Sequence, residues 1–513
     1  MLHRAFTGRL PALAGLLAVM LAAQHATVAA SARLRVESAE AGDPLAPRGR
    51  SFEVVSKPAD LEFGQVFNDL QQPVPLPPHV RQELAKGDHV ITAFQADVVE
   101  FSESGKVLGS VPLYDSYLHH YGAFIGDKEH LQHFYDMLHN TTSELGKSDG
   151  LGLGLDLAYG GGTGAMPMRE LEATFREFGK KAGKKNGFIG GGSGAEERGT
   201  KHVYPAPYGL VIAAGTDALM PLMHLIHTRG DVEPGTRYSP MAECTCSSDR
   251  DIDPAAGTID GKKPLIPFRC NEQLLLEHNS GCSLETYRNG FRCCDHMVYV
   301  SEPGARAGHA AARFGMKFTF WYEAAQPDVV ALRGAACCDA TGSLSGSGQI
   351  EYDIPRCAEG DEECVHTLVS YQYLDVPTRS SFNPSPSQGL SPEEKADIDA
   401  GREVELVYVV GHQHLGAAPT GIKLFKDSTD ELICESKPIM GQGTAPGDEK
   451  GYVVGMEPCI WGGDRTPPRL RRDAVVRVES TYNSTEPHYG VMSLFLMQVA
   501  DVPLPSEAIL KFE

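Results

Sequence analysis

Apolar and polar residues alternate, or strand-forming residues run together, in several short segments of the chain. The segments EVELVYVV (403–410), HVITAFQADVVEF (89–101) and MKFTFWYEA (316–324) are of this kind, and they predict β-strands that are half or fully buried. Pro and Gly residues separate these segments and mark turns. The pattern therefore predicts an all-β protein with the texture of a sandwich or a barrel.

A few segments depart from the strand pattern. Apolar residues between 168 and 178 share one face of a predicted helix, which lies between glycine-rich segments at 150–164 and 187–199. We interpret the glycine-rich segments as surface loops, because no βαβ pattern surrounds them as it would a nucleotide-binding loop. The Pro/Ser-rich segment 379–390 is a predicted connector, and Ser391 is expected to cap a short helix before the strand at 403–410.

The first 30 residues are typical of a secretory signal peptide. Arg4 and Arg9 precede an apolar run at 10–23, which is shorter than the roughly 20 residues that a bilayer requires. No later segment of the sequence is long and apolar enough to span a membrane. The sequence thus predicts a secreted protein, and the sequons at Asn140 and Asn483 are expected to carry glycans.

Length and charge narrow the class of protein further. The chain has 513 residues, more than one core usually supports, which favours two or three domains. Its formal net charge is −21, and it becomes −23 once residues 1–30 and their two arginines are removed. Nucleic acid is therefore not an expected partner.

Twelve cysteines in a secreted chain favour disulfides. Ten of them lie between 244 and 364, and the two outside this span, Cys434 and Cys459, are expected to pair with each other. An alternative is that the CTC motif at 244–246 and the adjacent pair at 293–294 bind zinc. Thiolates seldom stay reduced in an oxidising compartment, so disulfides are the preferred interpretation.

Two histidines separated by one residue follow the strand at 403–410. Alternate residues of a strand point to the same face, so His412 and His414 would place two imidazoles side by side, an arrangement that suits a borderline transition metal. Gly411 leaves room beside them. The alternative interpretation is a pair of hydrogen-bonded strand histidines with no metal.

Further candidate ligands lie earlier and later in the chain. His119 and His120 are adjacent, so they can bind one metal only if a bulge or a strand end brings both side chains to one face. His224 lies on another predicted strand, where a histidine is also compatible with core packing. Met492 opens the last strong strand, a position where methionine usually fills a core.

Several motifs resemble those of known families. AECTCSSD, FRCCDHM, GYVVGMEPC and STYNSTEPHYGVMSLFLMQVAD resemble motifs of the stress up-regulated Nod (SURNod) family, with similarity over residues 113–501. LYDSYLHHYGAFIG, LMHLIHTRG, GHQHLGA and HYGVMSLFLMQVAD are more remotely similar to the copper type II, ascorbate-dependent monooxygenases, such as the peptidylglycine and dopamine hydroxylating enzymes. The resemblance implies two jelly-roll-like β-sandwiches, at 51–235 and 291–513, with a cysteine-rich insertion at 236–290.

The resemblance to the monooxygenases also implies two copper sites. In those enzymes an adjacent His pair and a later His hold one copper, and an HxH pair and a Met hold the other. Carried over to this sequence, the ligands are His119, His120 and His224 in the first set and His412, His414 and Met492 in the second. We prefer His224 to His227 because its distance from the TRG motif matches that of the SURNod histidine. A thioether with two imidazoles favours Cu(I).

One position departs from the peptide-amidating enzyme. Val410 stands where that enzyme has an arginine that binds the substrate carboxylate, so a peptide substrate is not expected. We predict a secreted, copper-dependent monooxygenase that uses dioxygen and an ascorbate-like reductant to hydroxylate a small or wall-derived substrate. The alternatives are a non-catalytic secreted stress protein that binds copper or a cell-wall component, and a disulfide-stapled sandwich without metal.

Overall fold

The computed structural model describes most of the chain after residue 45. The described residues are 46–139, 187–239, 241, 299–301, 303–335, 338, 340, 352–354, 357–375, 392–415, 419–486 and 488–504. Several predicted features lie outside the described residues. They are the signal peptide, the helix at 168–178, the sequon at Asn140, the connector at 379–390, and most of the insertion at 236–290 with its cysteines. The predictions for those segments stay predictions.

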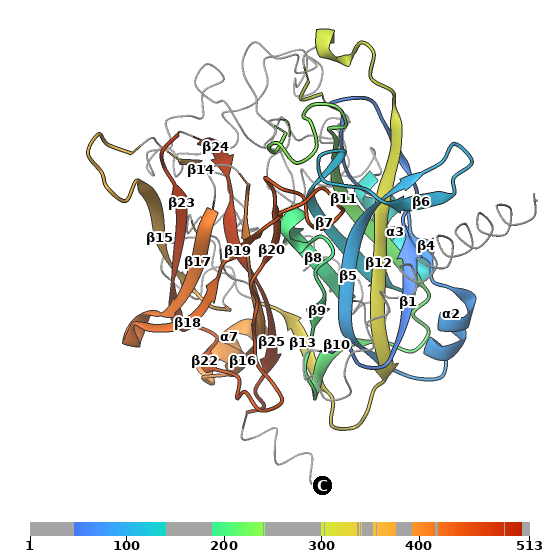
Figure 1. Ribbon diagram of the computed structural model, residues 1–513. Coiled ribbons are helices and arrows are strands. Elements are labelled where there is room, and N and C mark those ends of the chain that lie inside the picture. Colours follow the sequence, from blue (N-terminus) through green and yellow to red (C-terminus); the bar gives the residue numbers. More distant parts are fainter. Residues whose placement is uncertain are drawn as a thin grey trace, which may run out of the picture. The chain divides into compact units, whose positions relative to one another are not determined.

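Among the described residues, the largest sheet has twelve strands, and Figure 1 labels most of them. In order across the sheet, its main strands are β1 (Arg50–Val55), β12 (Ala312–Ala324), β5 (His89–Phe101), β10 (Tyr208–Ile212), β13 (Val330–Gly334), β25 (Ser493–Asp501), β16 (Glu403–Gln413) and β21 (Cys459–Ile460). Four short strands pair beside these: β2 (Ala59–Leu61) with β12, β6 (Val107–Ser110) and β9 (His202–Val203) with β5, and β22 (Arg469–Arg471) with β16.

The remaining described strands form smaller sheets. The five-stranded sheet contains β3 (Val66–Leu70), β11 (Ala218–His227), β7 (Ser116–Gly126) and β8 (Gly187–Ser193), with β4 (Val74–Pro75) beside β11. The four-stranded sheet contains β15 (Val365–Tyr373), β23 (Val475–Asn483), β17 (Pro419–Lys426) and β18 (Glu431–Ser436). Two further pairs are β14 (Tyr352–Ile354) with β24 (His488–Val491) and β19 (Pro438–Met440) with β20 (Val453–Met456).

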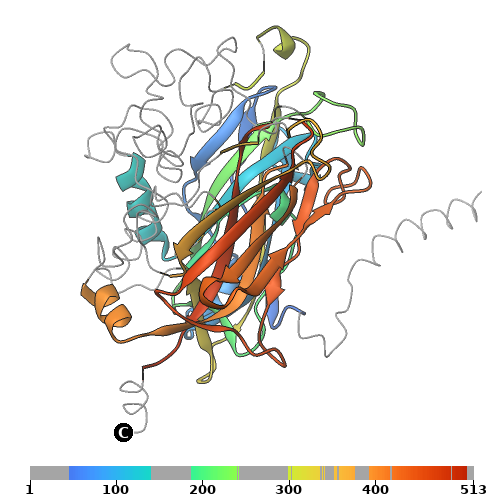
Figure 2. The same ribbon diagram turned by 90° about the vertical axis from the view of Figure 1, so that its left-hand side faces the viewer.

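Helices are few and short among the described residues. The α-helices are α2 (Pro78–Leu84), α3 (Lys128–His139) and α7 (Pro392–Asp399), and the 3₁₀ helices are η1 (Ala195–Glu197), η6 (Pro303–Arg306) and η7 (Asp427–Thr429). Figure 2 shows α7, in orange, outside the sheets. None of the helices in the described part of the chain has the length and apolar character needed to cross a membrane.

The predicted all-β, sandwich-like fold class is confirmed. Along β12 the buried side chains are the alternate ones, from Phe314 to Tyr322, as expected for a strand with one face in the core. Strand β16 is buried on both faces, and its core residues belong to the same hydrophobic cluster as Ile422 and Leu424 of β17. The strands β12 and β5 pair along nearly their whole length, although β12 lies within the predicted second domain. The division into two domains stays a prediction.

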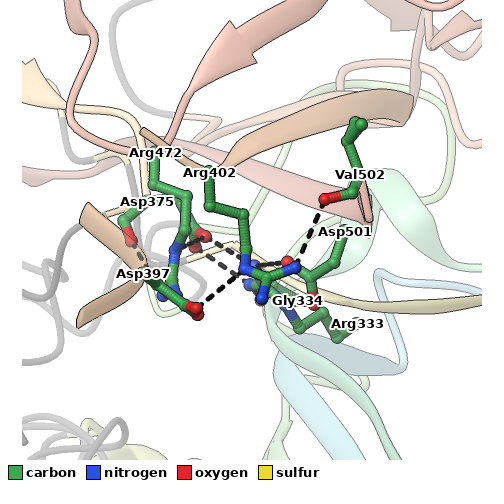
Figure 3. A network of polar contacts seen from close by, with 8 residues as sticks. All are labelled: Arg333, Gly334, Asp375, Asp397, Arg402, Arg472, Asp501 and Val502. Carbon is green, nitrogen blue, oxygen red and sulfur yellow. Dashed lines mark hydrogen bonds and ion pairs between the residues drawn. The ribbon is translucent and has the colours of Figure 1, made fainter. Parts of the chain in front are cut away.

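A network of charged residues fixes the start of β16 (Figure 3). Arg333 of β13 binds Asp375 through two hydrogen bonds of 3.0 and 2.6 Å, and it also binds Asp501 at the end of β25. Arg402 and Arg472 share Asp397 of α7, each at 2.9 Å or less. Bidentate and shared ion pairs of this kind restrict the positions of the groups that they join. They therefore fix the backbone at Arg402, directly before β16.

The predicted disulfide between Cys434 and Cys459 is confirmed, with 5.9 Å between the two Cα atoms. It joins β18 of the four-stranded sheet to β21, which pairs with β16. A second disulfide joins Cys357 to Cys364, and Cys338 is also disulfide-bonded. The described cysteines therefore fit the disulfide interpretation. The cysteines of the alternative zinc site, at 244–246 and 293–294, lie outside the described residues.

Replacing both Cys434 and Cys459 with serine is expected to lower the free energy of unfolding by about 3 kcal/mol, because the bond closes a loop of 25 positions and restricts the unfolded chain. The matched control replaces Cys357 and Cys364, which are only 7 positions apart, and should cost about 2 kcal/mol. Urea-induced unfolding measures both. A larger loss from the shorter loop would contradict the loop-length argument.

Candidate metal centre

Five buried histidines from three strands lie together. His119 and His120 are on β7, His224 is on β11, and His412 is on β16, with His414 directly after the end of that strand. All are at most 7% exposed. Strands β7 and β11 are buried along their whole length, because one runs beside the other in the five-stranded sheet and both faces are covered.

A β-bulge brings the adjacent pair to one side. In the pairing of β11 with β7, His224 lies opposite His120, and the next residue, Leu225, lies opposite Leu118. His119 is therefore the additional residue of the bulge, and its side chain is turned from the face that strict alternation would give it. The ring centroids of His119 and His120 are 4.5 Å apart. This is the local irregularity that joint metal binding by neighbouring histidines requires.

The two histidine sets predicted from the sequence adjoin each other. The ring of His119 lies 4.3 Å from that of His224 and 4.8 Å from that of His414, measured between centroids. His120 lies 5.1 Å from His412, and His412 lies 5.1 Å from His414. One ligand nitrogen from each of His119, His120 and His414 falls within 4.8 Å of the others. The geometry thus places both sets in a single cluster.

Met492, the sixth predicted ligand, lies next to this cluster along the backbone. Its carbonyl accepts a hydrogen bond of 3.2 Å from the backbone N–H of His414, which extends by one residue the register in which His412 pairs with Leu494. Directly opposite residues of antiparallel strands project to the same face. The Met492 side chain, which is 1% exposed, therefore lies on the face that carries His412 and His414.

His227 has different surroundings from His224. Its ring packs 5.3 Å from Phe314 and 6.1 Å from Phe63, and the Arg229 guanidinium is a cationic neighbour. A cationic neighbour disfavours a bound metal ion. His224, by contrast, has His119 and His120 beside its ring. The preference for His224 as a ligand stays a prediction.

Glu196 of η1 binds one of the five histidines directly. Its Oε1 atom is 2.5 Å from Nδ1 of His412, and both side chains are buried. A carboxylate at this position makes Nδ1 the donor, which leaves the lone pair on Nε2. Nε2 of His412 is buried and has no hydrogen-bond partner among the described residues.

The turn that carries Glu196 packs closely against the cluster. A Cβ atom at Gly194 would lie 2.5 Å from the His119 carbonyl oxygen and 3.1 Å from Cε1 of His412, so only glycine fits there. Two residues after Glu196, Arg198 binds Asp97 at 2.8 Å and also binds the buried Glu449. These two ion pairs tie the turn to β5, which carries Asp97, and to the segment before β20 (Val453–Met456), which carries Glu449.

Burial favours the neutral form of His119. The pKa of His119 lies well below its usual value, first because burial penalises the imidazolium and then because charge on His224 and the other histidines would repel it. Neutral imidazole is the form that binds metal ions. The fold therefore holds His119 in the state that a ligand requires.

A second buried polar group lies beside the histidines. Nδ1 of His202 is 2.8 Å from the Tyr408 hydroxyl, and Nε2 is 3.5 Å from the hydroxyl of Tyr121, the residue after His120. Burial lowers the pKa of His202 to about 3, so this imidazole is neutral and accepts or donates hydrogen bonds only.

The donor set fits a transition metal. Five imidazoles, one of them with a buried nitrogen that lacks a partner among the described residues, suit copper, zinc, iron or nickel rather than calcium or magnesium, which prefer oxygen ligands. No motif in the sequence indicates a role at this site for Gly194, Glu196, Arg198 or His202. The segment GSGAEERG has the composition of an exposed loop, so the sequence held no local signal for its role.

The family model described as stress up-regulated Nod 19 matches residues 179–502, which include His224, His412, His414 and Met492. The chain belongs to this SURNod family. The family resemblance inferred from the motifs is confirmed over these residues. No curated protein matches the sequence.

Seventeen chains of solved structures match this SURNod protein. One is peptide-N(4)-(N-acetyl-β-D-glucosaminyl)asparagine amidase, with 6% identity, coverage of 89% of this chain and 98% of the other, and a TM-score of 0.27. Another is PNGase F, a glycosylasparaginase from Flavobacterium meningosepticum, with 7% identity, coverage of 88% and 100%, and a TM-score of 0.24. These scores support no argument about the function of the SURNod protein.

Proposed function

We propose that this SURNod protein is a secreted copper protein whose metal is held by the five clustered histidines and Met492. The observation that carries the proposal is the convergence of five buried imidazoles, with Nδ1 of His412 bound to Glu196 and Nε2 without a partner among the described residues. If these histidines had only a structural role, this buried nitrogen would have no partner, and an unsatisfied buried polar atom costs free energy. A metal ion would satisfy it.

Copper is the proposed ion because of the sixth ligand. Imidazole serves copper, zinc and other transition metals, whereas a thioether adds preference for Cu(I). Met492 lies on the same face as His412 and His414, which supports its place in the ligand set. Two ions, one for each predicted histidine set, remain the proposed content.

The proposed activity is the hydroxylation of a small or wall-derived substrate with dioxygen and an ascorbate-like reductant. Bound copper would supply the exchange of electrons with dioxygen. The protein would supply the ligand geometry and a buried environment, since all five histidines are at most 7% exposed. Disulfides in the described residues are compatible with the proposed secretion.

The test is copper content together with oxygen consumption. The protein, expressed through a secretory pathway, should retain copper after dialysis and consume oxygen when ascorbate is added. His412→Ala and His120→Ala should lower copper content, because each removes an imidazole from the cluster. Met492→Leu keeps an apolar side chain of similar volume, and it should bind Cu(I) more weakly with little change in fold.

His79→Ala is the matched control, since His79 is an exposed histidine of α2. Copper bound without oxygen consumption would favour the non-catalytic alternative, in which the protein binds copper or a cell-wall component. Equal copper content in wild type, His412→Ala and His120→Ala would refute the proposed centre and favour a disulfide-stapled sandwich without metal.

A further inference from the structure

One carboxylate is built into the wall of the histidine cluster. The Glu196 side chain is 3% exposed, and its Oε1 atom accepts hydrogen bonds from Nδ1 of His412 at 2.5 Å and from the backbone N–H of Gly194 at 3.2 Å. Glu196 is thus held from both sides. A buried carboxylate is costly unless its charge is balanced.

The charges around Glu196 indicate what would balance it. Arg198, two residues later, is engaged with Asp97 and with Glu449, so this guanidinium already faces two carboxylates. The group that contacts Glu196 directly is the imidazole of His412, which belongs to the cluster. A cation held by the cluster would supply the charge that the carboxylate needs.

We infer that Glu196 is a positioning residue, which fixes His412 so that Nε2 faces the metal and supplies negative charge that favours Cu(II) over Cu(I). This inference rests on the proposed copper centre and extends it to the relative stability of the two oxidation states. The negative charge acts through His412, because an imidazole that donates to a carboxylate is a stronger electron donor. The negative charge of Glu196 also attracts the doubly charged Cu(II) more strongly than the singly charged Cu(I).

Gly194 allows the close approach of this turn to the histidine cluster. Its lack of a side chain lets the turn approach the His119 carbonyl and the His412 ring, where a Cβ would lie at 2.5 and 3.1 Å. The approach sets the short distance from Glu196 to His412. Glycine and glutamate in this turn therefore act together.

The test compares Glu196→Gln with wild type. Glutamine keeps the size and a carbonyl acceptor for Nδ1–H, but it removes the charge. We expect Glu196→Gln to bind Cu(II) about 10- to 100-fold more weakly, to lose less affinity for Cu(I), and to have a higher Cu(II)/Cu(I) reduction potential. The control is Glu53→Gln, which removes the same charge at an exposed position of β1 and should change neither affinity nor potential.

A second measurement does not depend on the folding of a variant or on copper. In wild-type, metal-free protein, nitrogen-15 NMR of the histidine rings should identify His412 as the tautomer with hydrogen on Nδ1. The opposite tautomer would overturn the inference, as would equal Cu(II) affinity and potential in Glu196→Gln and wild type. Absence of copper binding by wild type would instead refute the proposed function, and the NMR result would still decide how Glu196 orients His412.

Discussion

Metal-free protein is expected to lose at least about 4 kcal/mol of its free energy of unfolding between pH 7 and pH 5, because two buried histidines, His202 and His227, must stay neutral in the fold. Burial lowers the pKa of His202 to about 3, and burial with the nearby charges of Arg229 and His309 lowers that of His227 to about 4. An unfolded histidine has a pKa near 6.5. Below that pH the unfolded state binds more protons than the folded state, so stability falls as pH falls.

The size of the effect follows from linkage. Each histidine contributes about 1.4 kcal/mol per pH unit between its unfolded and its folded pKa, which is about 2 kcal/mol from pH 6.5 to pH 5. Both ring nitrogens of His227 are buried without a hydrogen-bond partner among the described residues. His119, whose pKa is also lowered, changes stability in the same direction.

Urea-induced unfolding at pH 7 and pH 5 measures this loss. His202→Gln and His227→Gln should each reduce the difference between the two pH values by about 2 kcal/mol, whatever their effect at pH 7. His79→Gln changes an exposed histidine and should leave the difference as in wild type. Equal pH differences in all four proteins would show that neither buried histidine controls acid stability.

Arg198→Met is expected to destabilise the protein by about 3–5 kcal/mol, because it leaves a buried carboxylate without its cation. The Arg198 side chain is 1% exposed and that of Glu449 is 0% exposed. Oε1 of Glu449 also accepts hydrogen bonds from the backbone N–H groups of Leu113 and Gly447, at 3.1 and 3.0 Å.

Two further variants test the cause. Arg198→Met combined with Glu449→Gln should recover part of the loss, since a neutral amide costs less to bury than a carboxylate. Arg313→Met removes an ion pair with Asp60, whose side chain is 70% exposed, and hydrogen bonds to the backbone carbonyl groups of Ser102 and Glu103. It should cost clearly less than Arg198→Met, because Asp60 stays in contact with water. Denaturant unfolding gives all three values. Arg198→Met must cost clearly more than Arg313→Met, or the ion pair is not the reason for the stability of this turn.

The sequence by itself determined the all-β fold class, the family and one disulfide. Alternation along β12 and β16 predicts strands because the side-chain period of two is a local property of the backbone. The pairing of Cys434 with Cys459 could be inferred because no other cysteine lies outside the span 244–364. The candidate ligands were also visible in the sequence, as motifs, and their role as metal ligands stays a proposal.

Only the tertiary structure decided how these histidines lie relative to one another. His119 and His412 are 293 positions apart, and the pairing of β7 with β11 and of β16 with β25 determines where each ring lies. A strand pattern gives the face of a residue, but not which sheet covers that face. The bulge at His119 likewise depends on the partner strand.

The turn from Gly194 to Arg198 shows most clearly what the sequence could not determine. Glycines, glutamates and an arginine in succession are typical of an exposed loop, so the sequence predicts a surface loop at this segment. In the structure, Glu196 and Arg198 are both 2% exposed, because Asp97, Glu449 and His412 come from distant parts of the chain to bind them. Burial of charge depends on such partners, and their proximity is a property of the fold alone.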